Sequence, residues 1–90
     1  MERAWIVRSS EDLGRAVAEI RTVRTLTQRE LAEQSGLSRP WLAKLESGRR
    51  VVVVDHLLRV LRRLGATVTV TFDIPDPAVD EGRRASTGAT

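Results

Sequence analysis

Residues 27–50 read TQRELAEQSGLSRPWLAKLESGRR, and this stretch decides the fold. Thr27 and Glu30 form a Thr-x-x-Glu capping box, which predicts the start of a helix. Gly36 predicts the end of that helix, because glycine readily takes the left-handed conformation that closes many helices. Ser38 is a favoured N-cap residue and predicts the start of a second helix. The stretch therefore predicts two short helices joined by a tight turn.

Apolar residues predict how these two helices pack. Leu31 and Ala32 supply the inward face of the first helix, and Leu42 and Leu45 point back toward it from the second. Pro40 does not break the second helix, because it falls in the first turn, where the N–H that proline lacks would have no intrahelical partner. The pattern is typical of a helix-turn-helix unit.

The same residues resemble a known family. The spacing Thr-Gln-x-x-Leu-Ala-x-x-x-Gly-Leu-Ser, followed by Leu42, Leu45, Glu46 and Gly48, resembles the Cro and phage-repressor (XRE) helix-turn-helix family. The resemblance implies a mainly α fold, a four- to five-helix lambda-repressor-like domain with a short C-terminal β-strand. It also implies a transcriptional repressor whose second motif helix enters the major groove of a palindromic double-stranded DNA operator.

Segments on either side of the motif are similar to the HipB-like antitoxin branch of this family. They are the approach Ser9–Ala16, Trp41 within the second motif helix, and the exit 57–65 before a strand. The similarity implies a homodimeric, autoregulating antitoxin of a HipBA-like toxin–antitoxin system, with a HipA-like kinase toxin as partner. A stand-alone phage-type regulator and a module that mainly neutralises a toxin are the alternatives.

Side chains at the start of the second motif helix are candidates for reading bases. Arg39 has the planar fork that pairs with guanine O6 and N7, and Lys44, one turn later, can reach a guanine or a phosphate. By carry-over from the repressor family, Gln28 contacts a phosphate and braces this helix. The predicted DNA-binding residues are Gln28, Ser38, Arg39, Pro40, Trp41, Lys44, Arg49 and Arg50.

Three of these residues have distinct expected roles. Arg49 and Arg50 follow the second motif helix and are expected to hold phosphates without reading sequence. Trp41 shares a face with Leu45, which favours packing at the core or its rim, but its position also permits contact with the DNA backbone or a thymine methyl. Pro40 and Trp41 replace the small polar residues common in phage repressors, so the base contacts of that family transfer only to Arg39 and Lys44.

A helix is predicted before the motif. Ser9 or Ser10 caps it, and its apolar residues recur at helical spacing: Leu13, Ala16, Val17, Ile20 and Val23. Glu46 matches a glutamate of the repressor family, which implies an ion pair with this helix. Arg15 and Arg21 are both possible partners.

A fourth helix and a strand are predicted after the motif. Asp55 is expected to satisfy the start of the helix, Gly65 ends it, and four leucines are expected on one face: Leu57, Leu58, Leu61 and Leu64. The alternation of valine, threonine and phenylalanine over residues 67–72 predicts a strand.

This strand needs a partner for its backbone N–H and C=O groups. Residues 5–8 and the same strand of a second copy are both available. The HipB-like resemblance favours a homodimer with an intersubunit sheet. The predicted dimerisation residues are Trp5, Leu61, Val68, Val70 and Phe72.

Basic residues concentrate around and after the second motif helix. The chain has a net charge of +3, but residues 39–63 hold seven basic residues against two acidic ones. Such charges suit a phosphate backbone, although they are also typical of a solvated surface. Their coincidence with the motif favours DNA.

Length and composition restrict the remaining possibilities. A chain of 90 residues suffices for one domain, expected at 1–74 for DNA binding and dimerisation, with a disordered tail at 75–90. His56 is the only histidine, cysteine is absent, and no phosphate loop or metal-spaced cluster occurs, so neither an enzyme, a cofactor nor a metal site is expected. With no signal pattern or membrane-length apolar stretch, we expect a cytoplasmic protein that is nucleoid-associated when bound to DNA.

Overall fold

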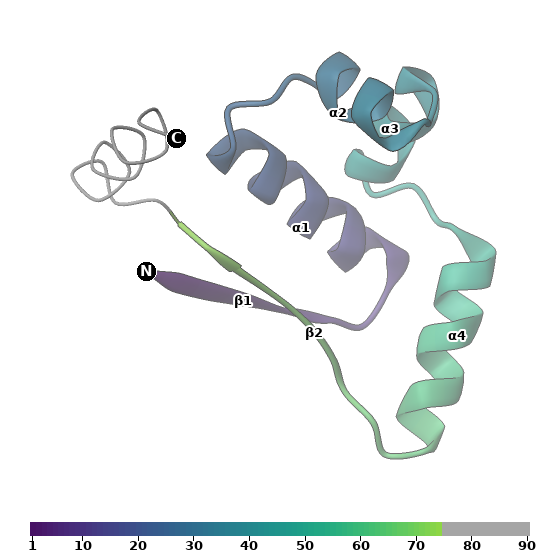
Figure 1. The fold of residues 1–90 in the computed structure, drawn as a ribbon. Coiled ribbons are helices and arrows are strands. Elements are labelled where there is room, and N and C mark those ends of the chain that lie inside the picture. The colour runs from purple at the N-terminus through teal and green to yellow at the C-terminus, as the bar shows by residue number, and fades with distance from the viewer. Residues whose placement is uncertain (75–90) are drawn as a thin grey trace.

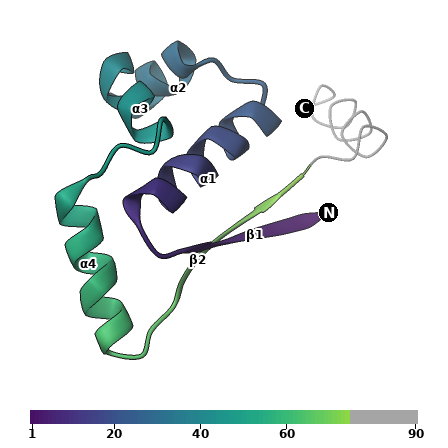
Figure 2. The same ribbon diagram turned by 180° about the vertical axis from the view of Figure 1, so that it is seen from behind.

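The computed structural model describes residues 1–74, which form four helices and two strands. In chain order these are β1 (Glu2–Val7), α1 (Ser10–Val23), α2 (Gln28–Ser35), α3 (Arg39–Glu46), α4 (Val52–Arg63) and β2 (Val68–Asp73). Helix α1 lies in the middle, with α2 and α3 on one side and the two strands on the other (Figures 1 and 2). The mainly α fold with a short C-terminal strand is confirmed. The tail predicted at 75–90 lies outside the described residues.

The caps of α2 and α3 form as predicted. The Thr27 hydroxyl accepts a bond from the Glu30 N–H at 3.0 Å, and the Glu30 carboxylate accepts one from the Thr27 N–H at 2.9 Å. This bond from the Thr27 backbone lowers the pKa of Glu30. Gly36 closes α2 with φ of +69°, and the Ser38 hydroxyl accepts the Trp41 N–H at 3.2 Å to begin α3. These contacts fix the turn between the two helices.

The centre of the motif is apolar. Ala32, Leu42 and Leu45 are buried against one another, and Val17, Leu31 and Val51 pack around them. The predicted inward faces of α2 and α3 are therefore confirmed, with Leu31 half-buried at the edge of the cluster. Residues from α1, α2 and α3 meet here, so these three helices share one core.

The N-termini of α1 and α4 are joined by a polar contact, which we call the Ser10–Asp55 clip. Ser9, and not Ser10, caps α1. Ser10 is 2% exposed; its N–H donates to the Asp55 carboxylate at 2.7 Å, and its hydroxyl accepts the Val51 N–H at 2.9 Å. Chiefly because of the bond from the Ser10 backbone, the pKa of Asp55 lies below its ordinary value.

The predicted role of Asp55 at the start of its own helix is wrong. Helix α4 begins after Val51, which offers no side-chain cap, while the Asp55 carboxylate bonds to Ser10 and to the Arg50 guanidinium, the latter at 3.2 Å. Asp55 is the fourth residue of α4, and its carboxylate accepts the N–H of Ser10, the first residue of α1. It therefore binds a donor from another helix and not a backbone N–H at the start of its own helix. At the other end of α4, the Arg62 guanidinium donates to the Arg8 carbonyl.

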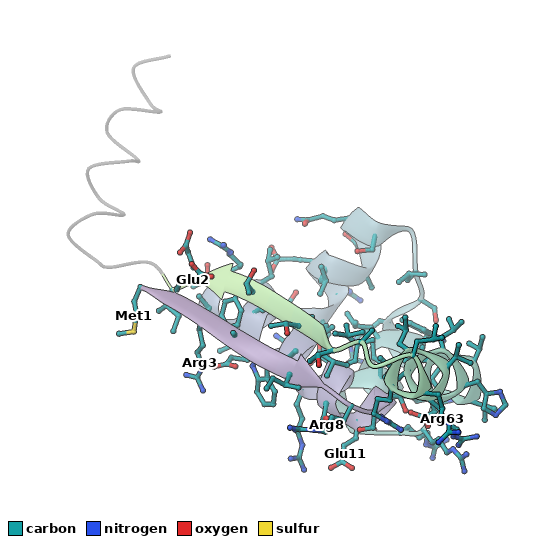
Figure 3. All side chains as sticks on the ribbon, turned by 90° about the horizontal axis from the view of Figure 1, so that it is seen from below. Met1, Glu2, Arg3, Arg8, Glu11 and Arg63 are labelled. Carbon is teal, nitrogen blue, oxygen red and sulfur yellow. The ribbon has the colours of Figure 1, made fainter. Side chains whose placement is uncertain are left out.

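The four leucines of α4 that were predicted on one face differ in their exposure. Leu58 is buried and Leu61 half-buried, whereas Leu57 and Leu64 are 59% and 75% exposed. Four exposed apolar residues at helical spacing form what we call the α4 outer stripe: Val53, Leu57, Val60 and Leu64. In all three views α4 stands at an edge of the molecule, and Figure 3 shows it nearly end-on with side chains directed away from the strands. The apolar arc of α4 is wider than one chain covers.

Strand β2 pairs with β1 of the same chain. The pairing is antiparallel and runs from Glu2 opposite Asp73 to Val7 opposite Val68. The two strands lie side by side in Figure 3. The structure thus pairs β2 within the chain, where the sequence favoured an intersubunit sheet, and β1, which is as long as β2, covers one edge of β2 along its whole length. The predicted N-terminal segment is a strand with wider bounds.

The predicted dimerisation residues on the two strands pack within their own chain. Trp5, Val68, Val70 and Phe72 lie on the face of the sheet that packs toward α1, as the predicted alternation of β2 requires. Phe72 is 8% exposed, and the Trp5 indole donates to the Glu19 carboxylate of α1. The structure therefore uses these side chains inside the domain, where the sequence had assigned them to a subunit interface.

Candidate nucleic-acid interface

The N-cap and the outer face of α3 carry five of the predicted DNA-binding residues. Ser38, Arg39, Pro40, Trp41 and Lys44 are all exposed. Leu42 and Leu45 point the other way, into the core. The burial of one face of an eight-residue helix thus fixes the opposite face toward solvent. The guanidinium of Arg39 and the ammonium of Lys44 are free to meet a ligand from outside.

A polar network ties α3 to α1 and α2. The Arg21 guanidinium binds the Glu46 carboxylate through two bonds, at 2.8 and 2.9 Å, and a third bond of 2.8 Å reaches the Leu26 carbonyl. The Gln28 amide donates to the same carboxylate at 3.1 Å. Arg15 pairs with Glu11 instead, so the structure selects Arg21 as the partner of Glu46. We call this set the Arg21–Glu46–Gln28 network.

The network lies largely out of solvent. The side chains of Arg21 and Glu46 are 19% and 5% exposed. Burial raises the pKa of Glu46, but the hydrogen bonds from Arg21 and Gln28 and the charge of Arg21 outweigh it and hold the pKa below its ordinary value. The bond to Glu46 raises the pKa of Arg21. Both groups are therefore charged at neutral pH, and the pair fixes the end of α3.

We predict that Glu46→Gln lowers the free energy of unfolding by about 2 kcal/mol at neutral pH, because Arg21 loses its charged partner. The folded-state pKa of Glu46 is depressed, so its stabilising effect is complete above the unfolded pKa of about 4.3 and is lost as the pH falls through the folded value. Urea unfolding of both proteins at several pH values tests this. The difference should shrink on acidification, and a constant difference would contradict the depressed pKa.

Gln28 has a contact that bears on its predicted role. Its side-chain amide braces the end of α3 through Glu46, which is the geometry that the resemblance implied. Gln28 is half-buried at the first position of α2, where backbone N–H groups are unpaired within the helix. A phosphate contact by Gln28 stays a prediction.

A hollow opens between α3 and the start of α4. It has a volume of about 200 Å³ and is lined by Trp41, Lys44, Leu45, Arg49, Arg50 and Val51. Trp41 is 45% exposed, which agrees with the predicted packing at the rim of the core and not with burial inside it. The core is filled by Leu42 and Leu45, and the indole lies at its rim. Arg49 and Arg50 are exposed beside it, with Arg50 also bound to Asp55.

Some supporting residues were not predicted from the sequence. The Ser10–Asp55 clip positions α4, and with it Arg49 and Arg50, relative to α1. Two successive serines before a helix were a visible signal, since one suffices as a cap and the second is free for another contact. No local pattern indicated that its partner would be 45 residues away.

Two further properties concern residues 1–74. In this part of the chain, no three or more His, Cys, Asp and Glu side chains gather closely enough to hold a metal ion. Nor does this part include a helix with the length and apolar character needed to cross a membrane.

Comparison with known proteins gave one family match. A family model described as a helix-turn-helix domain matches residues 3–73, which span both strands and all four helices of the described structure. No curated protein and no solved structure matched the chain.

Proposed function

Since this chain belongs to the helix-turn-helix domain family, we propose that it is a transcriptional repressor that binds a palindromic operator as a homodimer. The observation that carries the proposal is the exposure of Arg39 and Lys44 on α3, a helix whose other face is fixed by the core and by the Arg21–Glu46–Gln28 network. Reading bases requires such rigid support, because a bidentate contact tolerates little displacement. Arg39 is proposed to read a guanine.

Charge supports the same face. Lys44, Arg49 and Arg50 are exposed around the end of α3, and Glu46, the acidic residue of that helix, is neutralised by Arg21. Positive charge therefore faces outward where α3 would approach DNA. Phosphate contacts of this kind supply affinity and position, while the base contacts supply specificity.

A second copy of the chain is the partner that the α4 outer stripe fits. Its four apolar residues are each more than half exposed. The charged residues Arg59, Arg62 and Arg63 lie elsewhere on the helix. Two α4 helices related by a twofold axis can therefore pack together without burying like charges. A dimer presents two α3 helices to half-sites about 34 Å apart.

Arg39→Ala is predicted to relax sequence discrimination. A site is first selected from random duplexes, and binding to it and to scrambled DNA is then measured by fluorescence polarisation at near-physiological salt. We expect the wild type to prefer the selected site by about 10³-fold or more. Loss of one bidentate contact should reduce that ratio by about tenfold or more.

Arg49→Ala is the matched control for charge. It removes the same guanidinium from a position expected to hold phosphate, so it should weaken both DNAs by a similar factor and leave the ratio unchanged. Equal binding of the wild type to both DNAs would overturn the proposed function. An unchanged ratio in Arg39→Ala would remove Arg39 as the reader.

We further propose that the repressor is the autoregulating antitoxin of a HipBA-like system, which would place it in the cytoplasm and on the nucleoid when bound to DNA. The similarity of residues 9–16 and 57–65 to HipB-like proteins supports this. Co-purification with the product of a neighbouring kinase-like gene tests it. A complex without operator binding would favour a module that mainly neutralises a toxin, and the absence of any complex would favour a stand-alone phage-type regulator.

A further inference from the structure

The hollow beside Trp41 combines an apolar wall with a cationic rim. Leu45 forms its buried floor, and Trp41 and Val51 add apolar surface. Lys44, Arg49 and Arg50 lie around it, and the charge of Arg50 is partly balanced by its ion pair with Asp55. We call this the Trp41 hollow.

Its size and charge restrict what it can hold. The volume of about 200 Å³ is below the 300–1,000 Å³ typical of pockets for small molecules. The excess of positive charge favours an anion, and the apolar wall favours a ligand whose C–H groups lie next to its anionic group. A sugar–phosphate unit of a DNA strand has both parts, a phosphate joined to the largely apolar face of a deoxyribose. The Asp55 carboxylate, which pairs with Arg50, also accepts the Ser10 N–H.

We propose that the Trp41 hollow seats one sugar–phosphate unit of each operator half-site. The Trp41 ring packs on the deoxyribose, and Lys44, Arg49 and Arg50 surround the phosphate. This inference rests on the proposed function, and it makes Trp41 a positioning residue that sets the register of α3 in the major groove. The base read by Arg39 thereby depends on a residue that touches no base edge.

The indole suits this task because it is large and rigid. Ordering it costs little side-chain entropy for the area it covers. Trp41 is 45% exposed and lines the hollow together with the buried Leu45, so the residue is partly covered and partly open to a ligand. Trp41 lies outside the buried cluster of Ala32, Leu42 and Leu45, so variants at this position are expected to fold.

Methylphosphonate scanning of the selected site tests the seat, because it neutralises one phosphate at a time. For the wild type we expect that replacing the phosphate seated in the hollow, one in each half-site, weakens binding by about tenfold. In Trp41→Ala this penalty should fall below about threefold, while penalties at other phosphates stay the same; Trp41→Phe should retain the wild-type pattern. Arg49→Ala should reduce the penalty at the same phosphate.

If Trp41 has a purely structural role, Trp41→Ala should bind every duplex more weakly by a similar factor. The penalty at each methylphosphonate position would then equal that of the wild type, which would overturn the inference. A different phosphate responding to Arg49→Ala would also overturn it. Absence of a specific wild-type complex would overturn the proposed function and the inference together. A specific complex with an unchanged pattern would overturn the inference alone.

Fluorescence gives a second measurement that needs no change at Trp41. The chain has two tryptophans, and Trp5 lies on β1 against α1, away from α3. In Trp5→Phe all indole emission comes from Trp41. Binding of the selected duplex should reduce quenching by acrylamide by about twofold or more, since the ring loses its exposed surface. Unchanged quenching in a specific complex would overturn the seat.

Discussion

Gly14→Ala is expected to lower the free energy of unfolding by about 3 kcal/mol or more, enough to remove most of the stability of a domain of this size. A Cβ atom at this position would lie 1.9 Å from the Leu45 carbonyl oxygen and 2.9 Å from its carbonyl carbon. Both atoms belong to the backbone of α3, so no side-chain rotation relieves the overlap. Helices α1 and α3 would have to separate.

The direction of this effect is opposite to that expected from helix propensity. Alanine in place of glycine in the middle of a helix normally stabilises it by about 1 kcal/mol. The steric term must therefore exceed that gain. Thermal and urea unfolding monitored by circular dichroism measure the difference, with Arg15→Ala, the exposed neighbour on α1, as the control expected to change stability by less than about 0.5 kcal/mol. A Gly14→Ala protein as stable as the wild type would show that α1 and α3 are not so close.

The motif was predictable because its signals are local. Thr27, Glu30, Gly36 and Ser38 each act within one turn of the helix end that they define, and the structure confirms each of them. The burial of Leu42 and Leu45 follows from spacing along α3. No knowledge of the rest of the chain is required for these features.

The contacts between distant elements were not predictable in the same way. Arg15 and Arg21 both lie on α1, and only the placement of α3 decides which of them meets Glu46. The alternation over residues 68–72 predicts a strand but carries no information about its partner, which proved to be β1. Gly14 lies within a helical pattern, and no local signal indicated that the backbone of α3 would pass against it.

The candidate site was partly predictable for the same reason. The exposure of Arg39 and Lys44 follows from the face of α3 opposite its leucines. The environment of Trp41 does not, because the hollow is completed by residues from the segment that leads into α4. On α4 the periodicity predicted an apolar arc, while packing against one chain decided that only the edge at Leu58 and Leu61 would be covered.

That uncovered arc gives the second large expected effect. Leu57→Glu should convert the proposed dimer to a monomer, because twofold symmetry would bring two buried carboxylates together without partners. Leu57 is 59% exposed in one chain, so the monomer should still fold. Sedimentation equilibrium measures the association, and we expect the variant to be monomeric at concentrations where the wild type is dimeric.

Loss of the dimer should weaken binding to the full palindrome by about 10²-fold or more, because the second half-site is no longer bound by a linked subunit. Binding to an isolated half-site should be unchanged, which separates loss of association from damage to α3.

Val52→Glu is the matched control for association. It makes the same apolar-to-acidic change at a residue that is 52% exposed and lies about 140° around α4 from Leu57, and it should stay dimeric. If Leu57→Glu remains a dimer, the subunits associate through another surface, and the exposed edges of the β1–β2 sheet become the place to test next. If the wild type itself is monomeric while it binds the full site, the protein does not act through a preformed dimer.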